Sequence, residues 1–288
     1  MPEIAFHRPD TVEAAVALLA SHEGSRCVAG GQTLVAMLNA GLLEIPTLIA
    51  VSGIAELNSI SVEPNRTVRV GAAVSHRRVS AAPELHGSRA VIREAARVIA
   101  HPAIRNFGTI GGALAHADPA ADYPAAVVAA GARIEIAGKR GRRTVPAEAF
   151  FLDFLTTALE PAEMVTAVLV PNGKTGASGH YLKFSRVDGD YAIISIAVTL
   201  ESEAGVCSKV NIALGGCGPK PVFDVRANSL LLGTKCDSKV IAKAAEILVE
   251  VSDPVDDERA SANYRRALIP RLLPRAIRHA WLQCGTGP

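Results

Sequence analysis

Apolar side chains recur at helical spacing close to the start of the chain. Val12, Val16 and Leu19 fall on one face of a helix. Asp10, with Glu13 three residues later, has the pattern of a helix N-terminus in which Asp10 is the cap. The sequence therefore predicts an amphipathic helix that begins directly after Asp10.

Short apolar blocks with small or polar residues between them follow this helix. The blocks 27–29 and 47–51 predict two strands, and the residues between them predict a helix over 33–39. The blocks are too short for buried helices and have the length of strands. Together with the first helix they predict a compact βαβ-like unit over about residues 1–58.

Alternation of apolar and polar residues over 67–72 predicts the first strand of a second unit. The patterns that follow predict helices over 75–81, 88–100 and 123–131. A hairpin over 133–145 and a strand that ends at Val170 close the unit. Residues 171–176 read P-N-G-K-T-G, which is typical of a linker. The second unit therefore spans about 59–173, and both units form one domain over 1–173.

The last third of the chain has strand-like patterns first and helical ones after them. Strands are predicted over 180–185, 192–201 and 209–214, and helices over 238–251 and 262–283. Pro270 and Pro274 are expected to kink or divide the last helix. This order favours an α+β domain over 177–283, with helices against an antiparallel sheet.

Composition narrows the classes of protein. Of 288 residues, 49% are hydrophobic and 20% are charged, which is typical of a folded chain with more than one domain. The net charge of +2 gives no reason to expect nucleic acid as a partner. The basic run 139–143 is expected to be a solvated hairpin tip. No signal peptide or membrane span is predicted, so we expect a cytoplasmic protein.

Several common catalytic and metal-binding motifs are absent from the sequence. The five cysteines have no spacing typical of zinc or iron–sulfur sites, so any such cluster is expected on another chain. G-x-G-x-x-G, H-E-x-x-H and G-x-S-x-G do not occur, and the G-K-T at 173–175 lacks the first glycine of a Walker A loop. Rossmann, zinc-hydrolase and serine-hydrolase functions are therefore not supported.

Two Gly-Gly pairs, Gly30-Gly31 and Gly111-Gly112, stand where apolar stretches give way to small and polar residues. Glycine lets the backbone approach an anion closely, so that N–H groups converge on it. A helix that begins after Gly31 would add its positive end, and Thr33 and Thr109 would add hydroxyl groups. The residues alone leave open whether the pairs bind the pyrophosphate of a dinucleotide or form two ordinary turns.

The sequence around both pairs resembles the FAD-binding medium subunit of the molybdenum hydroxylases, the carbon monoxide dehydrogenase and xanthine dehydrogenase family. Residues 29–38 read A-G-G-Q-T-L-V-A-M-L, close to the family's A-G-G-Q-S-L-x-P-M-M, and residues 104–124 follow its second signature almost without a break. Thr33 keeps the hydroxyl of the usual Ser, whereas Ala36 replaces a Pro and Ala113 replaces a polar residue. Segments at 181–192, 214–222 and 264–266 extend the resemblance into the last domain.

The resemblance implies a fold and a function. The fold is α+β: a two-subdomain FAD-binding module of the PCMH type, followed by an α+β domain. The function is electron relay by non-covalent FAD in a heterotrimer. A large subunit would carry the molybdenum cofactor, a small subunit two [2Fe–2S] clusters, and a small molecule would accept the electrons. A self-sufficient FAD-dependent oxidase of the same superfamily is the alternative.

The resemblance also implies which residues contact FAD, and it assigns no catalytic acid, base or metal ligand to this chain. Asp122 would reach the polar groups of the cofactor, with Asp118 as a local alternative and helix capping as the structural one. Tyr191 would lie beside the isoalloxazine, and His116 would contact the cofactor through its backbone. The expected cofactor-binding residues are Ala29, Gly30, Gly31, Gln32, Thr33, Leu34, Val35, Ala36, Thr109, Ile110, Gly111, Gly112, Ala113, His116, Asp122, Lys183 and Tyr191.

Overall fold

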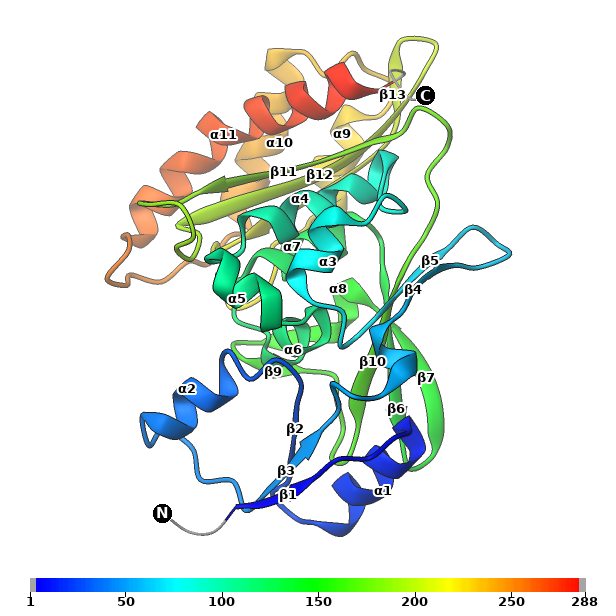
Figure 1. The fold of residues 1–288 in the computed structure, drawn as a ribbon. Coiled ribbons are helices and arrows are strands. Elements are labelled where there is room, and N and C mark those ends of the chain that lie inside the picture. Colours follow the sequence, from blue (N-terminus) through cyan, green and yellow to red (C-terminus); the bar gives the residue numbers. More distant parts are fainter. Residues whose placement is uncertain (1–3, 285–288) are drawn as a thin grey trace.

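The computed structural model describes residues 4–284, and its N-terminal unit is a small parallel sheet (Figure 1). The strands lie in the order β1-β3-β2. Helix α1 follows β1, and α2 lies between β2 and β3, as the sequence predicts for the βαβ-like unit. The bounds are β1 Ala5–His7, α1 Val12–Ser21, β2 Arg26–Val28, α2 Leu34–Asn39 and β3 Thr47–Ala50.

Two details of this unit differ from the prediction. The N-cap of α1 is Thr11, whose Oγ1 accepts a hydrogen bond from the N–H of Ala14 at 3.1 Å, so the assignment of Asp10 as the cap was wrong. Strand β1 was not predicted. It is three residues long and mostly exposed, so it carries no apolar pattern, and it forms by parallel pairing with β3.

The second unit is a five-stranded antiparallel sheet, in the order β4-β5-β10-β6-β7, with helices packed on it (Figure 1). The predicted hairpin is β6–β7. The sheet strands are β4 Ile60–Val62, β5 Val68–Gly71, β6 Arg133–Gly138, β7 Gly141–Pro146 and β10 Met164–Val170. The helices are α3 His76–Ala81, α4 Ala90–Val98, α5 Pro102–Phe107, α6 Ile110–His116, α7 Asp122–Ala129 and α8 Ala147–Phe150. The short elements are the 3-10 turns Ala55–Asn58 and Gly87–Arg89 and the strand pair β8 Phe151–Asp153 and β9 Thr156–Thr157.

The C-terminal unit is an antiparallel sheet, β11-β12-β13, with three helices on one face, which confirms the predicted α+β arrangement. Helix α9 was not predicted. The bounds are β11 Ser178–Phe184, β12 Ile194–Glu203, β13 Val206–Gly215, α9 Val225–Leu231, α10 Ser238–Glu250 and α11 Ala262–Gln283.

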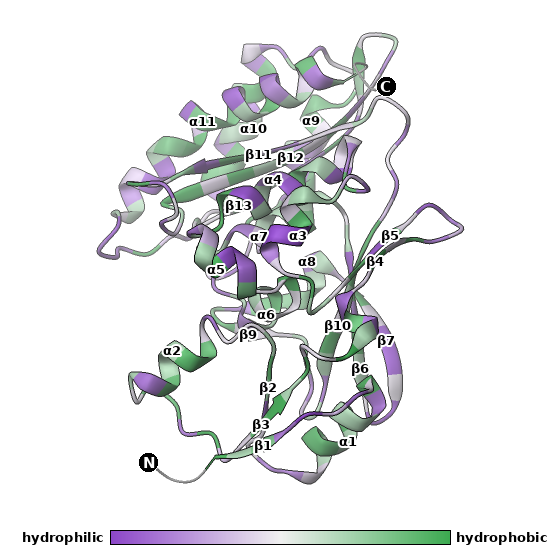
Figure 2. Cartoon of the chain, in the orientation of Figure 1, coloured by the Kyte–Doolittle hydropathy of each residue, from purple (hydrophilic) through white to green (hydrophobic). Residues whose placement is uncertain are grey.

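Helix α11 runs unbroken for 22 residues with Pro270 and Pro274 inside it, so these prolines do not divide it, and that they kink it stays a prediction. Each internal proline costs a helix roughly 3 kcal/mol. Five Leu and Ile side chains along α11 are buried against the sheet and α10, and at about 2 kcal/mol each their burial outweighs that cost. Hydrophilic and hydrophobic residues alternate along the helix, as expected when one face is buried (Figure 2).

Side chains on the two faces of β12 belong to two different hydrophobic cores. Ile194, Ile196 and Val198 belong to the core shared with α9, α10 and α11. On the opposite face, Ala197 belongs to the core of the N-terminal units, and the Oγ1 of Thr199 donates to the carbonyl of Ala129 at 2.8 Å, at the end of α7. Helices α4 and α7 therefore join the second unit to the C-terminal sheet. No helix within residues 4–284 is long and apolar enough to cross a membrane.

Candidate functional site

The first glycine segment is the loop between β2 and α2, and its backbone donors are unpaired. Gly31 has φ +70°, a conformation that glycine adopts without strain. The side-chain amide of Gln32 donates to the carbonyl of Gly30 at 3.1 Å, and this bond closes the loop on itself. The N–H groups of residues 30–33 have no acceptor within the described part of the chain. Because an N–H group without a partner favours an anion, this loop can bind one.

The second glycine segment is the start of α6, and its backbone donors are already used. Thr109 is the N-cap, and its Oγ1 accepts from the N–H of Gly112 at 3.2 Å. The N–H groups of Ile110 and Gly111 donate to the carbonyls of Val74 and Ala72, at 3.1 and 2.9 Å. The residues alone left open whether this segment is an anion site or an ordinary turn. In this structure the N–H groups of Ile110 and Gly111 fix the start of α6 onto the loop after β5, and the N–H of Gly112 is capped by Thr109.

The glycines also differ in what surrounds them. A Cβ on Gly30 would lie 1.9 Å from the carbonyl oxygen of Phe107, so the first segment touches the chain just before α6. A Cβ on Gly111 would lie 2.4 Å from that of Ala72. The absence of a Cβ at Gly30 and at Gly111 therefore leaves room for protein atoms. Gly112 is exposed, and a Cβ there would meet the Oγ1 of Thr109 at 3.0 Å and nothing else within 4 Å.

Asp122 and Lys183 form a buried ion pair at the junction of the second unit and the C-terminal sheet. The Nζ of Lys183 donates to the Oδ2 of Asp122 at 3.0 Å and to the carbonyl of Val98 at 3.1 Å. The hydroxyl of Tyr181 donates to the Oδ1 of Asp122 at 2.8 Å. Burial raises the pKa of Asp122, and the ammonium group of Lys183 opposes that shift. Both residues were expected near the cofactor, but their pairing was not visible in the sequence, and Tyr181 was not among the expected site residues.

Neither aspartate is the N-cap of α7. The cap position is Ala121, and Asp122 is the first helical residue, with its carboxylate on Tyr181 and Lys183. The Oδ1 of Asp118 accepts from the N–H of Ala120 at 2.8 Å, an Asx-type turn. Asp118 therefore shapes the turn before α7, whereas Asp122 connects α7 to β11.

Tyr191 and His116 lie at the surface. Tyr191 is 42% exposed, in the loop between β11 and β12, and the guanidinium of Arg259 lies 5.4 Å from the centre of its ring. His116 is the last residue of α6 and is half-buried. An exposed aromatic ring packed against a cation is consistent with a place beside a planar ligand, but the ring also has a protein partner in Arg259.

A buried aromatic pair, His76 and Tyr123, packs next to the second glycine segment. This contact was not identified from the sequence. His76 and Tyr123 have ring centres 5.3 Å apart, and the Nδ1 of His76 and the hydroxyl of Tyr123 have no hydrogen-bond partner among residues 4–284. A Cβ on Gly108 would lie 2.6 Å from the Nε2 of His76, so the imidazole packs directly on that segment. Burial lowers the pKa of His76 to about 4, which keeps the ring neutral near pH 7.

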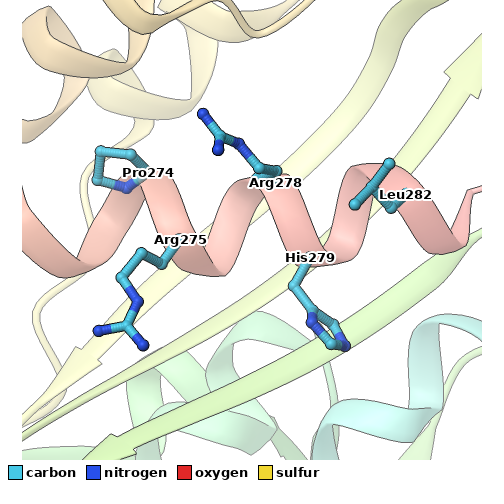
Figure 3. A pocket seen from close by; sticks show the side chains of 5 residues that line it. All are labelled: Pro274, Arg275, Arg278, His279 and Leu282. Atoms are coloured by element: carbon cyan, nitrogen blue, oxygen red, sulfur yellow. The ribbon is translucent and has the colours of Figure 1, made fainter.

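A hollow of about 260 Å³ lies elsewhere, along α11 (Figure 3). It is lined by Pro274, Arg275, Arg278, His279 and Leu282, all from that helix. No residue of either glycine segment contributes to it. This hollow is therefore separate from the candidate site.

Comparison with known proteins agrees with this arrangement. The family model described as the FAD binding domain in molybdopterin dehydrogenase matches residues 2–173. The model of the CO dehydrogenase flavoprotein C-terminal domain matches residues 179–280. The carbon monoxide dehydrogenase medium chain of Hydrogenophaga pseudoflava is 34% identical over 284 residues, covering 98% of this chain and 99% of that protein. The nicotine 6-hydroxylase medium subunit of Paenarthrobacter nicotinovorans is 32% identical, covering 96% and 97%.

Solved structures match over nearly the whole chain as well. Carbon monoxide dehydrogenase from Hydrogenophaga pseudoflava aligns with a TM-score of 0.95 and 34% identity, covering 99% of both chains. Quinoline 2-oxidoreductase from Pseudomonas putida 86 aligns with a TM-score of 0.90 and 31% identity, covering 98% of both chains. The resemblance read from the glycine segments is thereby confirmed, and the chain belongs to the FAD-binding medium subunits of the molybdenum hydroxylase family.

Proposed function

We propose that this chain binds FAD non-covalently and relays electrons between two partner subunits and an external acceptor. A small subunit with [2Fe–2S] clusters would deliver the electrons, and a large subunit with a molybdenum cofactor would oxidise the substrate. The observation that carries the proposal is the row of unpaired N–H groups over 30–33, in a chain whose family model is an FAD-binding domain.

The residues present fit the diphosphate of FAD. A pyrophosphate needs several donors within a short distance, and the loop over 30–33 presents consecutive N–H groups without competing acceptors. Gly112 adds an open backbone surface on α6. The first segment, 29–36, would therefore bind the phosphates, and the second, 109–113, would form a wall beside them. When bound, FAD supplies a carrier that accepts and gives up electrons singly or in pairs.

The ion pair of Asp122 and Lys183 would contribute polar contacts on the other side of the site. The resemblance implies that the carboxylate of Asp122, which accepts hydrogen bonds from Tyr181 and Lys183, would also contact polar groups of the cofactor. Tyr191 would cover one side of the ring system, and His116 would contact the cofactor through its backbone. None of these residues is required to move a proton for electron relay, because the chain would tune and orient the flavin rather than act on the substrate.

The experiment compares the full-length chain alone with the chain co-expressed with a large molybdenum subunit and a small iron–sulfur subunit. We expect the chain alone to be yellow, to release one FAD on heating and to oxidise no aldehyde or heterocycle. Activity should appear in the complex. A folded, colourless chain that takes up no added FAD would contradict flavin binding. Substrate oxidation by the isolated chain would instead support the self-sufficient oxidase.

A further inference from the structure

The fold gathers three cysteines that are far apart in the sequence. Cys207 lies near the start of β13, Cys236 lies just before α10, and Cys284 is the C-cap of α11. Two backbone bonds fix this arrangement: the N–H of Cys207 donates to the carbonyl of Thr234, and the N–H of Gly233 donates to the carbonyl of Cys207, both at 2.8 Å. The loop that contains Cys236 is thereby paired with the strand that contains Cys207.

Within this cluster, Cys207 and Cys236 form a pair. Each of the two thiols is the first cause of the pKa shift of the other, and the Sγ of Cys207 donates to the carbonyl of Lys209 at 3.5 Å. Cys207 is buried, whereas Cys236 is half-exposed and can meet a solute. The Sγ of Cys284 has other neighbours, the carbonyl of Leu200 at 3.3 Å and the Oγ of Ser178 at 3.4 Å.

The two thiols of the pair differ in reactivity. The neighbouring thiol of Cys207 lowers the pKa of Cys236, and the thiol of Cys236 raises the pKa of Cys207. The thiolate is the nucleophilic form of cysteine, so Cys236 is the member that reacts first. The remaining two cysteines differ from it, because burial raises the pKa of both Cys27 and Cys217 to about 12.

We propose that Cys207 and Cys236 form a reversible disulfide when the protein meets hydrogen peroxide. The sulfur of Cys236 attacks one peroxide oxygen, the O–O bond breaks, and a sulfenic acid and one water result. The sulfur of Cys207 then attacks the sulfur of Cys236, the S–O bond breaks, and a second water leaves. In total, two thiols are oxidised to one disulfide, and one peroxide is reduced to two waters.

The disulfide would join β13 covalently to the loop before α10, at a place where two backbone hydrogen bonds already hold them together. A thiol, such as glutathione, would reduce the bond by exchange at the half-exposed Cys236. This proposal concerns residues of the C-terminal unit and does not depend on whether FAD is bound.

The test counts thiols in the full-length protein, with and without FAD. After peroxide treatment the protein is unfolded, alkylated and weighed, and its peptides are mapped without reduction. We expect two of the five cysteines to escape alkylation, one peptide linking Cys207 to Cys236, and recovery of all five after dithiothreitol. Cys236→Ser should abolish this loss of alkylated thiols after peroxide, and Cys284→Ser should leave the loss unchanged. In Cys207→Ser, Cys236 should accumulate as a sulfenic acid that dimedone traps.

Two results would overturn the proposal. The first is a wild-type protein that keeps all five thiols after peroxide. The second is a linked peptide that joins a different pair, such as Cys236 with Cys284. Because both results are read from the wild-type protein, they hold even if a serine variant fails to fold.

Discussion

The two glycine segments look alike in sequence and differ in structure. The loop over 30–33 leaves its N–H groups unpaired, whereas the first N–H groups of α6 donate to Val74, Ala72 and Thr109. Gly111 packs on Ala72, while Gly112 is exposed and a Cβ there would meet only the Oγ1 of Thr109. A glycine pair therefore indicates close approach of the backbone but not what approaches it. The hydrogen-bond partners of the N–H groups separate a segment that can bind a ligand from one that packs against protein.

The largest effect is expected from Gly111→Val. Its Cβ would lie 2.4 Å from the Cβ of Ala72 and 2.7 Å from its carbonyl oxygen, so α6 would have to move. We expect a loss of more than about 3 kcal/mol in the free energy of unfolding, or no folded protein at all. Urea denaturation of the FAD-free chain measures this. Gly112→Val is the matched control and should remain folded; equal destabilisation of both variants would contradict the distinction between the two glycines.

The next effect concerns the aspartates that follow the second segment. Asp122→Ala would leave the ammonium of Lys183 buried without its carboxylate, at a cost of about 3–5 kcal/mol of folding stability. Asp118→Ala would lose one turn hydrogen bond, at about 1 kcal/mol. Denaturation curves measure both. The double variant Asp122→Ala/Lys183→Met should recover part of the loss. No recovery would mean that the carboxylate stabilises the fold through Tyr181 and not through the ion pair.

A pH dependence should arise from His76 behind the second segment. The folded pKa is about 4, below the ordinary value of 6.5, so the unfolded chain binds the proton more tightly. Folding stability should therefore fall as the pH is lowered from 6.5 to 4, by at most about 3 kcal/mol from this group. Unfolding curves at several pH values measure the slope. His76→Gln should flatten it, whereas His22→Gln, at a half-exposed position, should not; the same slope in all three proteins would remove His76 as the cause.

The smallest expected effect is on the affinity of the second glycine segment for FAD. Gly112→Val should weaken FAD binding tenfold or more, about 1.4 kcal/mol, because the added side chain extends into the open space on α6. Fluorescence titration with FAD measures the affinity. Ala242→Val, at an exposed position on α10, is the control for an added branched side chain and should bind FAD normally. Unchanged affinity in Gly112→Val would exclude this residue from the flavin site.

Much of the fold could be predicted from the sequence, because its strands and longer helices have regular apolar patterns. Helix α6 could not, since its first turn contains Gly111 and Gly112, each of which lowers helix propensity by about 1 kcal/mol. It forms because Gly111 fits against Ala72, a contact that no local pattern contains.

The candidate site was predicted as segments, not as contacts. The sequence named Asp122 and Lys183 separately, but their pairing depends on β11 lying across the end of α4, a tertiary arrangement. The cysteines illustrate the same limit, since Cys207 and Cys236 meet through backbone bonds between a strand and a distant loop. That FAD contacts the named residues stays a prediction.

Helix α7 has a consequence for how such proteins can evolve. All eight of its residues are buried, and its far side rests on β12 and β13, where Ala197 and Gly215 leave room for it. A gene fragment that ends at residue 173 would encode α7 without the strands β12 and β13 on which it packs. Recombination at the linker can therefore exchange the C-terminal unit only for another whose sheet offers small residues at the same positions. Two family models match separate stretches of the chain, yet the packing of α7 on β12 and β13 ties the two stretches together.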